Sequence, residues 1–288
     1  MTRLAVIIPS WHNTSLTALY DALHTQTRPP DEIIVVRGIA PNGRARNNGV
    51  AQSTAEWFLF IDDDAIPGHP ELIERLMQAA QQPHVIAVGS ARLLPCDAPS
   101  FQQQVASQVA RIIHPVVIDD TITNPDPPHY YCTITTTCML IHRRWFDEIG
   151  GFDEALVRGV DTEFFVRARR LHRLDRPANI VQAGNTWVYH PAPRTIRELW
   201  QKHFNYGIGH AQEVRRDPRR ARGGNWFSTP FHAGLWLLWR TVITPITCVV
   251  PYSYADPRWR LSWAPLKALA SYASALGYIH GWYYHAHT

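Results

Sequence analysis

Three consecutive carboxylates, Asp62, Asp63 and Asp64, follow the apolar run of residues 57–61. An apolar run of strand formers that leads into acids and is closed by Pro67 predicts a buried strand with acid at its carboxyl end. Side chains alternate between the faces of a strand, so Asp62 and Asp64 should point one way and Asp63 the other. Such carboxylates typically hold Mg²⁺ or Mn²⁺, often with substrate phosphates, and the sequence therefore predicts a divalent-metal site. The alternative is the acidic N-terminus of a helix that begins near Pro67.

The elements expected to position these acids are those of a parallel α/β sheet. Two continuous apolar runs, Leu4–Ile8 and Glu32–Val36, enclose a segment with helical periodicity at 16–24. A β-α-β unit with fully buried strands is typical of a parallel sheet flanked by helices. Further strands are predicted at 85–88, 133–141 and 186–189, and helices at 45–53, 70–80, 101–113, 144–149, 161–171 and 194–216.

Bulk properties place the chain in the globular class, since 45% of its 288 residues are hydrophobic. Its four cysteines form no CxxC pair, which predicts reduced thiols in the cytoplasm. Residues 1–8 run directly into a short apolar strand, so no signal peptide is expected. Residues 194–222 hold eight Lys or Arg against three acids, which suits anionic lipid or a pyrophosphate, or is a solvated helix face. No nucleic-acid partner is expected.

Several motifs, taken in order, resemble those of family 2 glycosyltransferases. They are Val6–Ser10, Gly43–Gly49, Phe60–Asp64, Cys138–Arg143, Gly150–Glu154, Gly159–Arg167 and Tyr189-His190. The resemblance spans roughly residues 4 to 210, and the order and spacing of the motifs make it more specific than any single one. It implies a GT-A fold, a nucleotide-diphosphate sugar donor, Mn²⁺ or Mg²⁺, and inverting transfer to a hydroxyl acceptor in polysaccharide or glycolipid synthesis.

The resemblance also assigns roles to residues. It implies that Asp64 is a direct metal ligand, that Asp62 faces the ribose or the metal, and that His190 reaches the metal or the diphosphate. A metal held in this way would neutralise the leaving pyrophosphate. The donor side implied by the resemblance consists of Pro9, Ser10, Arg37, Arg46, Asp62 and Asp63.

Inverting transfer also needs a base on the face opposite the leaving group. The resemblance implies that Asp161 is this base, although Asp161 also suits the N-cap of the following helix. The family often has Glu before this aspartate, where this chain has Val160. Arg37 follows the second strand, at a position where the family usually has an aspartate that contacts the nucleobase of the donor. The sequence therefore does not specify which nucleotide the donor carries. His190 is alternatively a structural loop residue, and Arg46 a surface ion-pair partner.

The sequence predicts a boundary that separates a GT-A domain, 1–224, from an aromatic-rich helical extension, 225–288. Residues 231–250 form an apolar stretch of membrane-spanning length, but Arg240 lies at its centre and Pro245 interrupts it. A charge at the bilayer midplane costs roughly 2.5–3.5 kcal/mol, so a helix lying in the membrane interface is the better fit. Trp236 and Trp239 are expected at headgroup depth, with 264–284 as a second such helix.

This extension predicts a protein that is peripheral on the inner face of the cell membrane and acts on a lipid-linked or polysaccharide acceptor. The alternative is that both helices pack as ordinary core or form a dimer interface. Two other functions stay open. A nucleotidyltransferase would need a glycine-rich phosphate loop after the first strand, which residues 9–13 lack. A non-catalytic carbohydrate-binding or scaffold protein would keep the fold without turnover.

Overall fold

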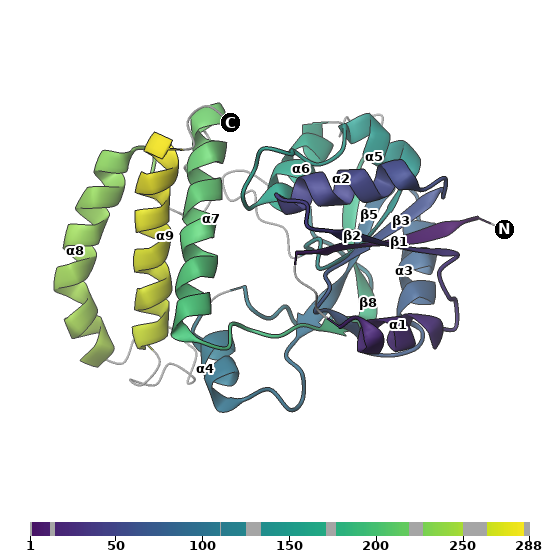
Figure 1. Ribbon diagram of the computed structural model, residues 1–288, viewed down its shortest axis with the longest axis horizontal. Coiled ribbons are helices and arrows are strands. Elements are labelled where there is room, and N and C mark those ends of the chain that lie inside the picture. The colour runs from purple at the N-terminus through teal and green to yellow at the C-terminus, as the bar shows by residue number, and fades with distance from the viewer. Residues whose placement is uncertain are drawn as a thin grey trace. The chain divides into compact units, whose positions relative to one another are not determined.

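The computed structural model describes residues 2–11, 15–109, 111–124, 134–170, 177–218, 227–249 and 264–284 (Figure 1). The chain divides into two compact units. The first comprises Met1–Leu93, His114–Leu156 and Val160–His190, and the second comprises Leu94–Ile113, Val157–Gly159 and Pro191–Thr288. The predicted boundary between residues 224 and 225 lies outside the described residues and stays a prediction.

The first unit is built around an eight-stranded sheet. Its strands run in the order β2 (Glu32–Arg37), β1 (Leu4–Ser10), β3 (Trp57–Ile61), β7 (Cys138–His142), β5 (Val85–Leu93), β8 (Asn179–Tyr189) and β4 (Ile66–Pro67), with β6 (Thr121–Ile122) beside β8. The strands predicted at 4–8, 32–36 and 57–61 are confirmed as β1, β2 and β3. β1 is parallel to both of its neighbours.

The sheet is mixed, whereas the sequence predicted a mostly parallel one. β7 is antiparallel to both β3 and β5. A parallel strand needs a crossover that returns the chain to the starting edge of the sheet. After β5 the chain instead passes through residues 94–113 of the second unit. It then enters β7 beside the end of β3, where the Asp62 amide donates a hydrogen bond to the Thr137 carbonyl at 3.3 Å.

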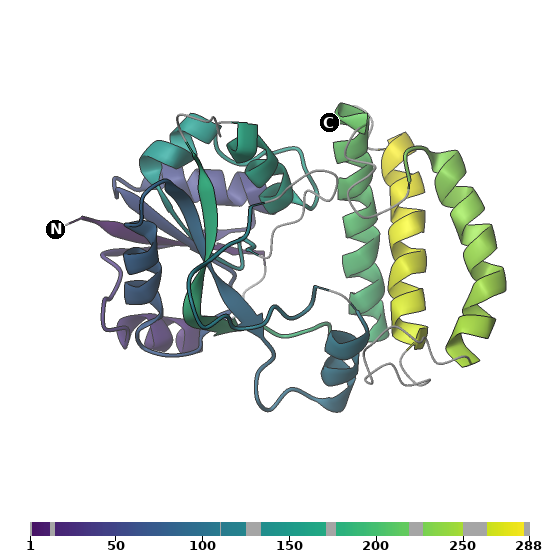
Figure 2. The same ribbon diagram turned by 180° about the vertical axis from the view of Figure 1, so that it is seen from behind.

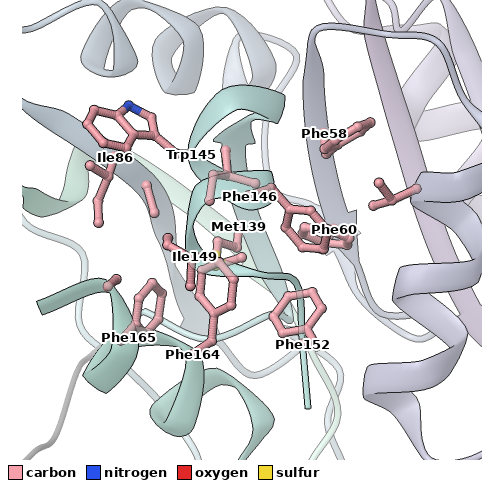
Figure 3. Close-up of a cluster of buried hydrophobic side chains, with 14 of the residues drawn as sticks. Phe58, Phe60, Ile86, Met139, Trp145, Phe146, Ile149, Phe152, Phe164 and Phe165 are labelled. Carbon is pink, nitrogen blue, oxygen red and sulfur yellow. The ribbon is translucent and has the colours of Figure 1, made fainter. Parts of the chain in front are cut away.

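Helices cover both faces of this sheet. On one face α2 (Asn42–Gln52), α5 (Arg143–Ile149) and α6 (Val160–Arg170) enclose a core rich in aromatic residues, and on the other α1 (Thr17–His24) and α3 (Leu72–Ala80) cover an aliphatic core. Figure 3 shows the aromatic core, in which the Phe60 and Phe152 rings lie 5.0 Å apart and the Phe152 and Phe164 rings 4.9 Å apart. These contacts fix the loop that contains Phe152 against the strand that leads to the acids.

Several predicted element ends were wrong. The strand predicted at 186–189 begins seven residues earlier, at Asn179. Gly184 and Asn185 interrupt the apolar pattern and lie at a register shift in the pairing with β5, which resumes at Trp187. The strand predicted at 85–88 continues to Leu93. The helix predicted at 101–113 is α4 (Ser100–Gln108), and β7 starts at Cys138. Some residues of other predicted elements lie outside the described part of the chain, namely 133, 171, 219–224 and 250.

The second unit contains α4 and three long helices, α7 (Ile196–Arg216), α8 (Pro230–Val249) and α9 (Ala264–Tyr284). Figures 1 and 2 both show α9 between α7 and α8. α7 and α9 approach closely because glycines face each other: a Cβ on Gly207 would lie 2.1 Å from the Ser274 carbonyl, and one on Gly277 would lie 2.0 Å from that of Phe204. Among the residues that the structure describes, no helix is long and apolar enough to cross a membrane.

Candidate active site at the carboxyl edge of the sheet

The predicted donor-side residues gather where β1, β2 and β3 end. These parallel strands finish at the same edge of the sheet, and Ser10 lies opposite Arg37 in the register of β1 and β2. Pro9 pairs with Val36 one step earlier and is buried, whereas Arg37 is exposed. The three carboxylates come directly after β3 in a turn that the Ala65 amide closes by donating to the Asp62 carbonyl at 3.0 Å.

The carboxylates have different partners within this turn. The Ser10 hydroxyl donates to Asp63 Oδ2 at 2.8 Å, which ties the end of β1 to the end of β3. Burial raises the pKa of Asp63, and the charges of Asp64 and Asp62 raise it further, against the opposing hydrogen bond from Ser10. Asp62 and Asp64 instead share a third neighbour, His190. The expected division of the three acids into two directions therefore agrees with their contacts, although a turn rather than a strand produces it.

Arg46 is the buried cation of this edge. It projects from α2, is 2% exposed, and donates from its guanidinium to Asp62 Oδ1 at 2.6 Å. Its guanidinium carbon lies 6.0 Å from the centre of the Phe152 ring. The surface ion pair that the sequence left open for this arginine is therefore wrong. A buried charge needs such a partner, because an unpaired one pays a large desolvation penalty.

Asp62, Asp64 and His190 form a cluster that could hold a metal ion. One ligand atom from each lies within 4.8 Å of the others, and His190 Nε2 is 3.3 Å from Asp64 Oδ1. Pairing of β4 with β8 brings Asp64 and His190 together. Ile66 lies opposite Tyr189, Asp64 comes two residues before Ile66, and His190 directly follows Tyr189. The His190 amide also donates to the Leu93 carbonyl at 2.9 Å. Two carboxylates and one imidazole are a suitable ligand set for a divalent cation.

Asp161 lies in the first turn of α6 and is not a member of this cluster. One of its carboxylate oxygens accepts the Thr162 amide at 2.9 Å, a contact between adjacent residues. The N-cap role considered for Asp161 is wrong, because α6 already begins at Val160. The start of α6 packs on the start of α2, where a Cβ on Gly43 would lie 3.2 Å from Val160 Cγ1 and 2.6 Å from the Asp153 carbonyl. Only glycine allows this approach. The same helix, α2, thus carries Arg46 to Asp62 and touches the residue that precedes Asp161.

Two residues of this edge were missed by the sequence reasoning. Asn47 of α2 accepts the Phe152 amide at 2.9 Å and donates to the Phe152 carbonyl at 2.8 Å, so it holds the loop that leads toward α6. Arg92, near the end of β5, donates to the Thr137 hydroxyl at 3.4 Å. Continuing the apolar pattern of 85–88 past Gly89 would have placed Arg92 at the carboxyl end of its strand.

Part of the chain and its fold match known proteins. Residues 42–150 match the family model of Glycosyl transferase family 2. A 134-residue segment is 30% identical to the O-antigen biosynthesis protein RfbC of Myxococcus xanthus and covers 44% of this chain. The aligned segment spans only 10% of the length of that curated relative.

Among solved structures, the mannosyltransferase PcManGT from Pyrobaculum calidifontis, in complex with GDP-Man and Mn²⁺, has a TM-score of 0.57 at 12% identity. The match covers 98% of this chain and 87% of that one. The likeness confirms the fold, whereas Asp161 and His190 lie outside the matched family segment. Residues 42–150, which carry Arg46 and the three carboxylates, thus match the model of Glycosyl transferase family 2, and the fold around them is of the GT-A type.

Proposed function

We propose that this protein is a metal-dependent, inverting glycosyltransferase that moves a sugar from a nucleotide-diphosphate sugar to a hydroxyl of a glycan acceptor. The observation that carries the proposal is the convergence of Asp62, Asp64 and His190 within 4.8 Å at the carboxyl edge of the sheet. Ligands of open α/β sheets bind at this edge. The family 2 segment that contains both carboxylates supports the same conclusion.

The donor side is assigned to the residues around the turn after β3. Asp64, Asp62 and His190 would hold Mn²⁺ or Mg²⁺, which when bound supplies positive charge to the leaving diphosphate. The mannosyltransferase neighbour, solved with GDP-Man and Mn²⁺, supports both a nucleotide-diphosphate sugar and a divalent cation. Arg46 keeps Asp62 oriented through its 2.6 Å hydrogen bond, and the bond between Ser10 and Asp63 keeps β1 and β3 in register beside the donor.

The acceptor side is assigned to Asp161. In the proposed step the acceptor hydroxyl oxygen attacks the anomeric carbon, the bond from that carbon to the diphosphate oxygen breaks, and Asp161 takes the hydroxyl proton. The nucleoside diphosphate leaves with the bonding electrons, so atoms and charge balance. One oxygen of Asp161 accepts the Thr162 amide, which fixes the carboxylate. The other oxygen is the one to which the proposal assigns the proton.

The acceptor is proposed to be a lipid-linked or polysaccharide glycan, at the inner face of the cell membrane. The similarity of a 134-residue segment to an O-antigen biosynthesis protein supports this acceptor class. The C-terminal helices supply the second support, since α8 exposes an apolar face that is described below.

Two substitutions test the proposed roles separately. Asp64→Ala should abolish Mn²⁺-dependent binding of nucleotide diphosphate in calorimetry, whereas Asp161→Asn should leave binding within about threefold and lower release of nucleoside diphosphate by at least about 10². Asp97→Asn, at an exposed aspartate, is the matched control and should behave as wild type. Wild-type turnover in Asp161→Asn would refute the base assignment, and release of pyrophosphate instead of nucleoside diphosphate would favour a nucleotidyltransferase. A thermal-shift screen of nucleotide diphosphates with Mn²⁺ would identify the base.

A further inference from the structure

The outward face of α8 is apolar along its described length. Phe231, Leu235, Leu238, Trp239 and Val242 are 69%, 49%, 69%, 55% and 67% exposed. Their spacing of i, i+4, i+7, i+8 and i+11 places all five within one stripe of an α-helix. We call these five residues the α8 stripe. Contiguous exposed apolar residues of this kind mark an interaction surface rather than ordinary surface variation.

The opposite face of α8 is occupied inside the unit. Ala233 is fully buried, and Trp236 packs against Phe227 and Tyr272 with ring centres 5.3 Å and 6.4 Å apart. Trp236 and Trp239, both expected at a membrane surface, therefore point in different directions. Only Trp239 belongs to the stripe. α9, predicted as a second interfacial helix, instead buries Ala268, Ala270, Ala273, Ala275 and Tyr278.

Charge identifies the partner that this face fits. Residues 218–288 contain seven Lys or Arg and one acid, Asp256. The exposed described positions of α8 carry no charged side chain, and the arginine of this helix, Arg240, is only partly exposed. Arg215 and Arg216 are exposed at the end of α7. Arg215 lies 5.4 Å from the Trp282 ring of α9, and beyond it Tyr283 and Tyr284 are 64% and 76% exposed.

We infer that the α8 stripe inserts into the interface of an anionic lipid membrane, with α8 lying in the membrane plane. Apolar side chains on one face of the helix, aromatic residues within that face and a cationic, nearly acid-free C-terminal sequence are the features of an interfacial helix. The stripe extends from Phe231 to Val242, 11 steps of 1.5 Å or roughly 17 Å, which suits a helix lying along the surface. This inference rests on the proposed peripheral location and specifies the surface that produces it; it does not depend on glycosyl transfer.

Sedimentation of the full-length protein with vesicles tests the stripe. Wild type should bind vesicles that contain phosphatidylglycerol, and should bind pure phosphatidylcholine at least about fivefold less because the cations then lack partners. Leu238→Glu with Val242→Glu should lower the bound fraction on anionic vesicles at least tenfold. Gln78→Glu with Gln81→Glu, at exposed positions of the first unit, adds the same charge and should bind as wild type.

Tryptophan quenching gives a second readout that does not need the charged variants to fold. Brominated lipids should quench fluorescence of the bound wild type. Trp239→Phe should remove most of that quenching, whereas Trp236→Phe should retain it because Trp236 packs inside the unit.

Three outcomes would overturn the inference. The first is unchanged vesicle binding by Leu238→Glu with Val242→Glu, which would leave the peripheral location intact but place the contact elsewhere. The second is a wild-type dimer in light scattering that the same variant converts to monomer, which would make the stripe an interface between copies. The third is no vesicle binding by wild type, which would remove the location as well, while diphosphate release in solution would still report on the enzyme activity.

Discussion

The guanidinium of Arg46 and the carboxylate of Asp62 form a hydrogen-bonded ion pair of 2.6 Å, with the arginine side chain 2% exposed and the aspartate 23% exposed. Arg46→Met should lower the free energy of unfolding by about 2–3 kcal/mol, less than for a fully buried pair because water still reaches Asp62. Asp62→Asn should cost at least as much, since it leaves Arg46 without its charged partner. Urea denaturation measures both.

The double variant Arg46→Met with Asp62→Asn decides whether the pair acts as a unit. It should be more stable than the sum of the two single effects predicts, because neither charge is then left alone. Strict additivity would contradict the assigned pair. Arg75→Met, which breaks the exposed ion pair with Glu71, is the control and should change stability by less than about 0.5 kcal/mol.

His190 should control metal affinity without controlling the fold. His190→Gln removes the imidazole that lies 3.3 Å from Asp64, so Mn²⁺ affinity measured by electron paramagnetic resonance should fall roughly tenfold or more. The thermal midpoint without metal should stay within a few degrees, because the backbone bond from His190 to Leu93 remains. His24→Gln, at an exposed histidine of α1, should bind Mn²⁺ as wild type does. Equal affinities for both variants would remove His190 from the ligand set.

Arg92 should contribute to anion binding at the carboxyl edge. A hydrogen bond from a charged donor is worth about 1.5–3 kcal/mol, so Arg92→Met should raise the KM for donor or acceptor roughly 10- to 100-fold. kcat should change less, because a positive charge at this position would act in binding rather than in proton transfer. Arg92→Lys should recover part of the loss by keeping the charge. Steady-state kinetics in which both substrates are varied separate the two sites. An unchanged KM for both would show that Arg92 has a structural role only.

Substitution by alanine should have opposite effects on stability at two glycines, Gly43 in α2 and Gly234 in α8, because only Gly43 lies close to another segment, the loop at Asp153. Gly43→Ala would force its Cβ to 2.6 Å from the Asp153 carbonyl, so it should destabilise the first unit and reduce turnover. Gly234→Ala in α8 meets nothing within 4 Å and gains helix propensity, so it should stabilise by up to about 1 kcal/mol. Thermal unfolding and turnover of the two variants test the contrast, and a neutral Gly43→Ala would mean that the loop moves away freely.

His203 predicts acid sensitivity of the second unit. Burial, assisted by the charge of Lys202, lowers the pKa of His203 to about 4 from 6.5. Below pH 6.5 His203 therefore becomes protonated in the unfolded chain, whereas in the folded chain it stays neutral down to about pH 4. Stability should fall across this window by up to about 3 kcal/mol and be fully present above it. Hydrogen exchange of the α7 amides at pH 7 and 5 measures the change. His203→Gln should flatten the difference; an equal loss in this variant would assign it to other groups.

Most of the fold was accessible from the sequence because its signals are local. The apolar runs of β1 and β3 and the acids that follow them are contiguous in the chain, so their order and exit edge could be predicted. The position of His190 beside Asp64 could not be derived from periodicity. It depends on β4, a two-residue strand that contains Pro67 and has no pattern of its own. The antiparallel direction of β7 was likewise hidden, because it follows from where the chain travels between Leu93 and Cys138.

Side-chain orientation on helices was only partly accessible. Trp236 and Trp239 lie three residues apart in the same apolar stretch, and the apolar pattern does not distinguish their environments. Packing of α8 on α9 makes the difference, since it buries the face of Ala233 and leaves that of Leu238 exposed. The importance of Asn47 was hidden for a similar reason, because its partner Phe152 lies 105 residues away.

The pairing of β4 with β8 places the candidate metal ligands on a structure with very little cooperative stability of its own. β4 contributes two residues at the margin of the sheet, where opening of the hydrogen bonds is cheapest. Opening of that margin should separate Asp64 from His190 and leave the rest of the sheet intact. Binding of the cation and the donor should therefore stabilise the pairing of β4 with β8. Hydrogen exchange of the Gly68 amide, which donates to the Trp187 carbonyl, should slow far more on binding than exchange of the β1 amides. The affinity of the protein for the proposed donor would then include the free energy of closing its own sheet.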